Sequence, residues 1–144
     1  CAVEAIKATA ARGIRTGAHL ILGLPGENRQ KILSHADRVS ELPLTALKLH
    51  QLQLVKKTKM AHQFAEHPEW FHLYTADEYI DLVIDFIERL NPKIAIERMV
   101  SQSPPAFLIA PDWKLKNFEF IMKVEKELIR RNTWQGRYYK KKRP

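Results

Sequence analysis

The sequence predicts an α/β fold in which helices pack on a parallel β-sheet. Segments in which apolar residues recur every three or four positions alternate with short, almost continuously apolar segments, and Gly or Pro residues separate them. Helices and strands that alternate in this way form right-handed strand–helix–strand units. Three strands can form a small open sheet, whereas an eight-stranded barrel needs about 250 residues. We therefore expect either a small α/β sandwich or part of a barrel whose other strands lie upstream.

The first half of the chain predicts two helices and two strands. In chain order these are a helix over residues 3–11, a strand over 17–24, a helix after Asn28 and a strand over 46–55. Gly13 is a typical stop for the first helix, and the turn from Gly23 to Glu27 ends the first strand. Asn28 is a residue type that caps helices, and Pro43 breaks the chain before the second strand.

The second half begins with a stretch that has no period of its own. Residues 56–74 are basic and contain histidines, so we expect a loop there. Thr75 to Glu78 form a capping-box pattern, which predicts a helix that ends at Asn91 and Pro92. A third strand is expected over residues 93–100, a Pro-rich loop over 101–116 and a last helix over 117–131.

Composition narrows the class of protein. The 144 residues include 24 Lys and Arg, 16 Asp and Glu and a single cysteine, and 45% are hydrophobic. These values suit one soluble domain and exclude a disulfide scaffold. No apolar run approaches the roughly 20 residues of a membrane helix and no signal peptide is visible, so a cytoplasmic location without membrane contact is expected. The chain starts with Cys1 inside a running apolar pattern, so we expect a piece of a longer protein.

Positive charge is concentrated at the C-terminus. From Lys123 onward nine Lys and Arg accompany two Glu, whereas the preceding residues are close to neutral. Trp134, Tyr138 and Tyr139 offer rings for stacking near the basic tail from Lys140 to Arg143. A small α/β module that binds RNA or another polyanion through this tail is one functional hypothesis. A solvated terminus is the favoured interpretation of the tail itself.

Polar side chains interrupt the predicted strands. His19, Lys48, His50 and Glu97 each lie within an otherwise apolar segment. Alternation places the leucines of the first strand opposite His19, puts Lys48 and His50 on one face, and separates Glu97 from Arg98. Burying such groups without partners is costly, although a neighbour could satisfy each one alone. Together they predict a polar site in a cleft or barrel interior.

Other patterns indicate no specific chemistry. The turn from Gly23 to Glu27 lacks the Lys–Ser/Thr pair of a P-loop and is explained by a tight strand-to-helix connection. His62, His67 and His72 match no zinc spacing, so no metal site is predicted. Cys1 has no identifiable partner for nucleophilic catalysis.

Residues 19–27, HLILGLPGE, resemble the fifth-strand motif GxIxGxxGE of radical S-adenosylmethionine (SAM) enzymes and the same strand of oxygen-independent coproporphyrinogen oxidases. Four further segments, LKLHQLQLVKKTKMA, IERMV, PPAFLIAPDW and TWQG, are similar to a group of bacterial radical-SAM proteins described as uncharacterised Fe–S oxidoreductases. The chain also resembles Elongator-like radical-SAM barrels. The resemblance extends from about residue 13 to residue 136.

The resemblance implies a TIM-type (β/α)6 barrel, of which this chain supplies the last three parallel strands. Residues 1–100 are then the C-terminal half of the barrel, and residues 101–144 are an extension with a helix and the basic tail. The barrel of such enzymes holds SAM over a [4Fe–4S] cluster, and a 5′-deoxyadenosyl radical abstracts hydrogen from the substrate. The cofactors supply the chemistry, while the protein positions the reactants.

Site residues also follow from the resemblance, although no catalytic residue does. Those expected to bind the cofactor are His19, Ile21, Gly23, His50, Gln53, Leu54 and Val55. Those expected to face the substrate are Lys48, Glu97 and Arg98. Ile21 and Gly23 match motif positions near the adenine, whereas His19 stands where the motif has Gly, or Asp in the coproporphyrinogen group.

The family's cluster motif, CxxxCxxC, is absent from this chain, and three thiolates cannot come from one cysteine. We therefore expect the C-terminal part of a radical-SAM Fe–S oxidoreductase with an unknown substrate, which alone is inactive and binds neither SAM nor a cluster. Its partner is then the missing N-terminal half of the barrel. An exposed sheet edge is expected to promote dimers.

Overall fold

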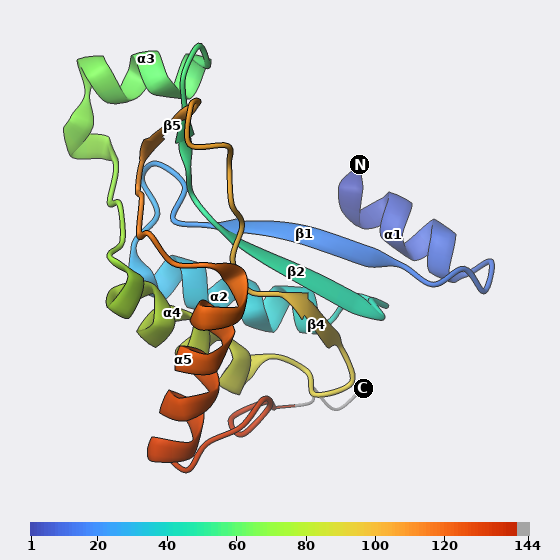
Figure 1. Ribbon diagram of the computed structural model, residues 1–144. Coiled ribbons are helices and arrows are strands. Elements are labelled where there is room, and N and C mark those ends of the chain that lie inside the picture. Colours follow the sequence, from blue (N-terminus) through green and yellow to red (C-terminus); the bar gives the residue numbers. More distant parts are fainter. Residues whose placement is uncertain (141–144) are drawn as a thin grey trace.

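The computed structural model describes residues 1–140 of the chain (Figure 1). Parallel strands form the main sheet in the order β1–β2–β4, and β3 and β5 form a separate antiparallel pair. The strands are β1 (Gly17–Leu22), β2 (Ala46–Gln51), β3 (Leu54–Val55), β4 (Ala95–Arg98) and β5 (Leu108–Ala110). The helices are α1 (Ala2–Ala10), α2 (Arg29–Ser40), α3 (Lys59–Glu66), α4 (Ala76–Arg89) and α5 (Asn117–Arg130), and Pro68–Trp70 form a 3-10 turn, η1. The predicted α/β class with a parallel sheet is confirmed.

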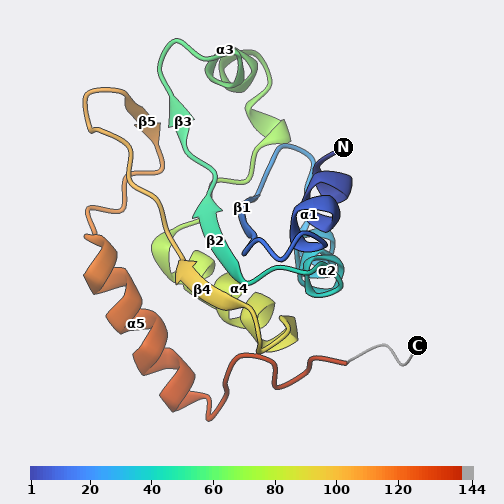
Figure 2. The same ribbon diagram turned by 90° about the vertical axis from the view of Figure 1, so that its right-hand side faces the viewer.

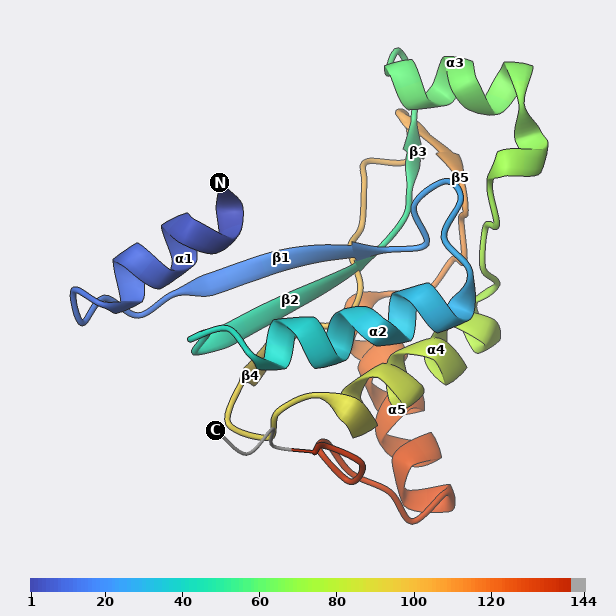
Figure 3. The ribbon, with the colours of Figure 1, turned by 180° about the vertical axis from the view of Figure 1, so that it is seen from behind.

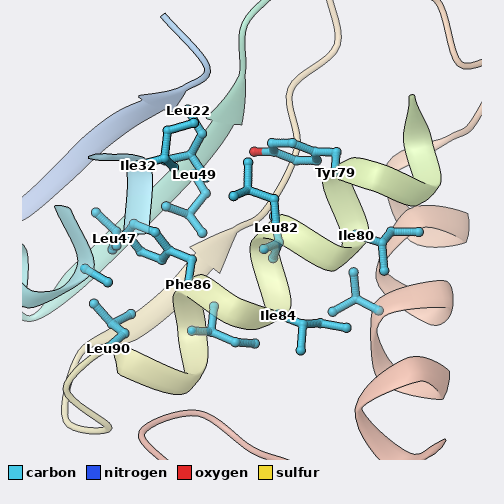
Figure 4. Packing of buried hydrophobic residues seen from close by; sticks show 14 of the residues in the cluster. Leu22, Ile32, Leu47, Leu49, Tyr79, Ile80, Leu82, Ile84, Phe86 and Leu90 are labelled. Carbon is cyan, nitrogen blue, oxygen red and sulfur yellow. The ribbon is translucent and has the colours of Figure 1, made fainter. Parts of the chain in front are cut away.

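Helices α2 and α4 cover one face of the main sheet (Figures 1 and 3). Leu22 of β1 and Leu47 and Leu49 of β2 are fully buried in the same core as Leu82 and Phe86 of α4 (Figure 4). Because side chains alternate along a strand, the residues between these leucines point away from the helices. The hydrophobic pattern thus decides which face of the sheet is packed, and burial of this apolar surface is the main stabilising contribution.

The remaining elements extend from this two-layer body. In Figure 1, α3 and the β3–β5 pair rise from the end of the sheet at which β1 and β2 finish. Figure 2 shows α1 on the β1 side of the sheet and α5 on the opposite side. Helix α5 buries Phe120 and Val124, and the side chain of Arg131 after its last turn bonds Asp81 of α4. Among residues 1–140, no helix has both the length and the apolar character of a bilayer-spanning segment.

Local signals place the starts of α2 and α4 where the sequence predicts them. The side chain of Asn28 accepts a hydrogen bond from the backbone N–H of Lys31 at 2.8 Å. Thr75 and Glu78 form the predicted capping box at the start of α4. These caps satisfy backbone donors that a helix leaves unpaired, and they depend on a few neighbouring residues alone. The two helices could therefore be located without any knowledge of the tertiary structure.

The predicted strand over residues 46–55 is wrong in its second half. β2 ends at Gln51, opposite Leu22, the last residue of β1. Beyond this point β1 no longer offers a partner, and the chain turns away, so that Leu54 pairs with Ala110 of β5. A strand needs a neighbour to accept and donate its hydrogen bonds, and here the neighbour changes.

Two predicted loops contain regular structure. Residues 56–74 include α3 and η1, and residues 101–116 include β5. The hydroxyl of Thr58 caps α3 by accepting a hydrogen bond from the backbone N–H of Ala61 at 3.2 Å. Thr58 is a residue type that caps helices, so the sequence does carry a signal for α3. The segment has no clear hydrophobic period, however, and a loop is therefore expected from its pattern. β5 had no such local signal, because it pairs with β3, a segment far from it in the sequence.

Candidate functional site

The side of the main sheet that α2 and α4 leave uncovered carries most of the predicted site residues. We call it the open face and define it by His19, Ile21, Lys48, His50, Glu97 and Arg98, two residues from each strand. Ile21 is 44% exposed, although a strand residue of this type is usually buried. The open face therefore combines an uncovered apolar side chain with several charged and titratable ones.

Polar side chains on the open face contact one another across the strands. The Nδ1 atom of His19 lies 3.0 Å from the Nε2 atom of His50, and the two rings stack. The Nζ atom of Lys48 lies 3.4 Å from Oε2 of Glu97. Partial burial, followed by the charges of His19, Arg98 and Lys48, lowers the pKa of His50. The four residues predicted to form one polar set thus lie on the same side of the sheet.

A bulge in β4 directs two consecutive side chains to the open face. After Leu47 the register shifts by one residue, so that Lys48 pairs with Arg98 and Glu97 is the extra residue. Bulges of this kind redirect side chains. Glu97 contacts Lys48, and Arg98 is close enough to His50 to lower its pKa. The prediction that Glu97 and Arg98 lie on opposite faces is therefore wrong, because it assumed regular alternation.

A pocket of about 380 Å³ lies at the carboxyl end of β1 and β2. Its lining includes five of the residues predicted to bind a cofactor: His19, Ile21, His50, Gln53 and Val55. The other lining residues are Leu24, Gln51, Leu52, Met60, Ser101 and Ser103. Ligands of parallel α/β sheets bind at this end of the strands, in a mainly apolar pocket with a few polar groups. The lining therefore suits a partly apolar ligand that also carries hydrogen-bonding groups.

Gly23 and Leu54, also predicted to bind a cofactor, do not line this pocket. Gly23 is buried with φ +87°, and a Cβ atom there would lie 3.0 Å from Cε2 of Tyr74. Leu54 is fully buried. The turn conformation and close packing account for the glycine, and core packing accounts for the leucine.

Sequence reasoning missed a polar cluster that borders the pocket. Gln51 donates from Nε2 to the carbonyl of Ser101 at 2.7 Å and accepts from the backbone N–H of Ser101 at 2.8 Å. Gln53 accepts a hydrogen bond from the hydroxyl of Ser103 at 2.9 Å. Gln51 is the last residue of β2 and Gln53 follows it, while the two serines follow β4. Their pairing therefore holds the loop after β4 against the end of β2. In the sequence, the spacings Gln-x-Gln and Ser-x-Ser are the only sign of this hydrogen-bonded cluster.

Glu27 closes the turn that follows β1. Its Oε2 atom accepts a hydrogen bond from the backbone N–H of Leu24 at 3.0 Å, and its Oε1 atom lies 2.8 Å from Nε2 of His35 in α2. The N–H of Gly26 donates to the carbonyl of Trp70 at 3.1 Å. The carboxylate thus fixes the turn from both sides and holds Leu24 where it lines the pocket.

The structure shows no cluster suited to a metal ion. Within residues 1–140, no group of three or more His, Cys, Asp or Glu side chains is arranged to hold one. Cys1 is free and exposed. His67 stacks on Trp70 at a centroid distance of 4.0 Å, and His72 meets Tyr74 edge-on. These ring contacts account for two of the three histidines in residues 56–74.

The C-terminal segment displays aromatic and basic side chains together. The guanidinium of Arg137 lies 5.2 Å from the ring centroid of Trp134 and 5.5 Å from that of Tyr138. Both rings are more than half exposed. The backbone N–H of Tyr138 donates to the carbonyl of Glu88, which holds the segment against the end of α4. Residues 141–143 of the predicted basic tail lie outside the described residues.

Comparison with known proteins identifies the family to which this chain belongs. Residues 44–130 match the family model described as Radical_SAM C-terminal domain. The chain is 31% identical over 141 residues to the uncharacterized protein YtqA of Bacillus subtilis, covering 98% of this chain and 43% of YtqA. It is 37% identical over 138 residues to the uncharacterized protein MJ0486 of Methanocaldococcus jannaschii, covering 93% and 41%. YhcC of Escherichia coli is 27% identical over 117 residues, covering 81% and 37%.

The chain spans less than half the length of these curated relatives. Among solved structures, the archaeal Methanocaldococcus infernus Elp3 with an N-terminal deletion has the same fold, with a TM-score of 0.75 and 14% identity. The match covers 93% of this chain and 31% of that one. The arrangement of strands and helices described above therefore recurs as one part of a larger solved protein.

Proposed function

Because this chain belongs to the Radical_SAM C-terminal domain family, we propose that its open face forms part of the wall of a SAM-binding barrel in a longer Fe–S oxidoreductase. The observation that carries the proposal is the asymmetry of the sheet. Helices bury the leucines on one face, while the other face bears polar groups beside a pocket. Parallel sheets are normally covered on both faces, and a polar face favours an enclosed site over a packed core.

The missing cover, on this proposal, is the N-terminal half of the barrel, the partner expected from the sequence. The lengths of the relatives support it, since each is more than twice the matched length. The exposed side chain of Ile21 and the unpaired outer edges of β1 and β4 among the described residues support it as well. In this chain alone, the same features promote association of two copies, which sedimentation at increasing concentration tests.

The residues of the pocket fit the adenosyl part of SAM. Ile21, Val55 and Met60 supply apolar surface, and Gln53 and Ser103 supply hydrogen-bonding groups. An adenine needs this combination, because its faces are apolar and its edge carries donors and acceptors. When bound in the longer protein, SAM supplies hydrogen-abstraction chemistry. This chain positions its adenosyl group and excludes water from it.

The residues of this chain do not fit a [4Fe–4S] cluster. Such a cluster is held by several thiolates, and the sequence contains one cysteine, which is exposed at the start of α1. No acidic or histidine cluster in residues 1–140 offers a substitute. The cluster ligands therefore belong to the remainder of the longer protein.

The test compares a protein of the relatives' length that contains this chain with the chain alone. The longer protein, purified without oxygen, is expected to contain iron and to cleave SAM to 5′-deoxyadenosine, and the chain alone to do neither. A longer protein that is free of iron and inert towards SAM would contradict the proposal.

A binding experiment tests the pocket without the cluster. In the longer protein, Gln53→Ala is expected to weaken binding of 5′-methylthioadenosine about tenfold, because it removes a hydrogen-bonding group from the pocket. Gln30→Ala, on the exposed surface of α2, is the matched control and is expected to bind normally. Equal affinity of both variants would argue against an adenosyl group in this pocket.

A second proposed function is the binding of RNA or another polyanion by the C-terminal segment. Arg137 between two exposed aromatic rings favours it, because bases stack on such rings and phosphates pair with arginine. Fluorescence anisotropy with a labelled single-stranded RNA is expected to show binding that falls steeply with salt. Trp134→Ala is expected to weaken it, whereas Trp70→Ala, at a distant exposed ring, is expected to leave it unchanged. An equal loss of RNA affinity in both variants would show that the C-terminal segment is not a specific RNA-binding site.

A further inference from the structure

Arg98 is an exposed arginine that the bulge in β4 presents beside Lys48. Among residues 1–140, no carboxylate pairs with its guanidinium. Lys48 is 35% exposed in its side chain and contacts only one carboxylate, that of Glu97. Two cations are therefore held side by side on the open face, and one of them lacks a counter-charge.

We propose that Lys48 and Arg98 form a binding site for an acidic group, a carboxylate or a phosphate, of the substrate. This inference rests on the proposed function, because it places the substrate over the open face. It goes further in assigning a chemical class to the substrate and a position to its acidic group. Arginine presents a planar fork of donors that matches both groups, and lysine adds a second positive charge.

The other groups on the open face leave this site positively charged. β1 contributes His19 and the apolar Ile21, β2 contributes Lys48 and His50, and β4 contributes Glu97 and Arg98. The only carboxylate in this set is Glu97. Partial burial, followed by the neighbouring charges, lowers the pKa of His50, so its ring adds hydrogen-bonding capacity at pH 7 with little charge. A histidine held neutral can accept or donate a hydrogen bond to a bound acid.

The carboxylate of Glu97 occupies the position beside Lys48 that the acidic group of the substrate is proposed to take. Its distance of 3.4 Å from Lys48 exceeds the roughly 2.7–2.9 Å of a strong charge-assisted hydrogen bond. Its side chain is 52% exposed, so water weakens the attraction. A ligand that engages both Lys48 and Arg98 makes more contacts than Glu97 makes with Lys48 alone. An incoming carboxylate or phosphate is therefore able to displace Glu97 from Lys48.

The placement of the cations also separates this site from the adenosyl pocket. Lys48 and Arg98 do not line that pocket, whereas His19, Ile21 and His50 do. The histidine pair therefore lies between the two. A substrate bound over β2 and β4 has its acidic end at the cations and its body beside the pocket, where an adenosyl group is proposed to lie.

The test is a titration of this chain with inorganic phosphate at constant ionic strength, followed by amide NMR shifts of β2 and β4. Lys48→Gln and Arg98→Gln are each expected to weaken phosphate binding about tenfold, since each removes a charged hydrogen-bond donor. Glu97→Gln is expected to tighten it, because Lys48 loses its competing partner. Lys93→Gln, an exposed lysine just before β4, is the matched control and is expected to bind phosphate as the unaltered chain does.

Two results would overturn the inference. Equal phosphate affinity in Lys48→Gln, Arg98→Gln and the control Lys93→Gln, which have the same overall charge, would show that anions respond only to the overall charge of the chain. In the longer protein, an Arg98→Gln variant that loses affinity for SAM but keeps it for 5′-methylthioadenosine would assign the cations to the carboxylate of SAM and remove the substrate from this site. Failure of the proposed function is a separate result: 5′-methylthioadenosine then does not bind the longer protein, whatever phosphate does to this chain.

Discussion

The Nδ1 atom of His19 lies 3.0 Å from the Nε2 atom of His50, and the two rings stack with their centroids 5.0 Å apart. The residues are diagonal neighbours on β1 and β2, because His19 pairs with Lys48 and Ile21 pairs with His50. One ring donates an N–H hydrogen bond that the other accepts, so only one of the two facing nitrogens carries hydrogen. Partial burial, followed by the charges of His19, Arg98 and Lys48, lowers the pKa of His50.

His50 is expected to protonate below the ordinary histidine pKa of about 6.5. Lys48→Met is expected to raise its pKa, because a positive charge that disfavours the imidazolium is removed. Lys93→Met, which changes a distant lysine, serves as the control. Imidazole NMR signals followed from pH 8 to pH 4 measure the effect, and an unchanged His50 midpoint in Lys48→Met would contradict it.

The lowered pKa of His50 also makes the stability of the chain depend on pH. A folded-state pKa below the unfolded value means that the unfolded chain binds more protons, so the free energy of unfolding falls as the pH drops from about 6.5 through the folded-state pKa. Replacing His50 by Gln is expected to flatten this part of the stability profile. Urea unfolding at several pH values between 7 and 5 measures it.

Gly23→Ala and Gly26→Ala separate backbone strain from steric overlap. Both glycines have positive φ, but a Cβ at Gly23 lies 3.0 Å from Tyr74, whereas one at Gly26 has nothing within 4 Å. Gly26→Ala is expected to cost about 1 kcal/mol and Gly23→Ala about 2 kcal/mol or more. Chemical denaturation measures both. Equal losses would show that the Tyr74 ring moves aside without cost.

Gln51→Leu is expected to lower the free energy of unfolding by about 1–3 kcal/mol, because it leaves the backbone N–H and carbonyl of Ser101 without their partner. It is also expected to raise hydrogen exchange in residues 101–103, since the loop loses its attachment to β2. Gln30→Leu on the exposed surface of α2 is the matched control. A variant as stable as that control would show that water replaces the lost bonds.

Tyr79→Phe is expected to keep or increase stability by up to about 2 kcal/mol. The Tyr79 hydroxyl is fully buried, burial raises its pKa, and it has no hydrogen-bond partner among residues 1–140. Removing an unsatisfied buried hydroxyl relieves its desolvation cost, while the ring keeps its contacts with Trp113 and Phe120. Thermal unfolding measures the change, and a clear loss of stability would reveal a partner for the hydroxyl.

Glu127 is expected to contribute to acid stability. Hydrogen bonds from Arg130 and then Arg131 lower its pKa to about 2, and Arg131 also contacts Asp81 and Asp85 of α4. Because the folded pKa lies below 4.5, this contribution is present above pH 4.5 and is lost as the pH falls towards 2. Glu127→Gln is expected to be less stable at pH 7 and to match the unaltered chain near pH 2. Equal stability at pH 7 would contradict the contribution.

Much of the fold could be predicted because its signals are local. The cap at Asn28, the box from Thr75 to Glu78 and the alternating leucines of β1 and β2 depend on residues close in the chain. The motif at residues 19–27 likewise indicated the family, to which the match over residues 44–130 assigns the chain. Site roles taken from the motif stay predictions.

The sequence by itself determined the α/β class, the covered face of the sheet and the presence of polar groups on the other face, because each follows from the period of the side chains. Only the tertiary structure decided that β2 ends at Gln51, that Glu97 and Arg98 share a side, and that Ser101 closes the pocket. These features depend on which strand or loop lies beside each residue. Hydrogen bonds between distant segments fix them, and a local pattern does not encode such pairings.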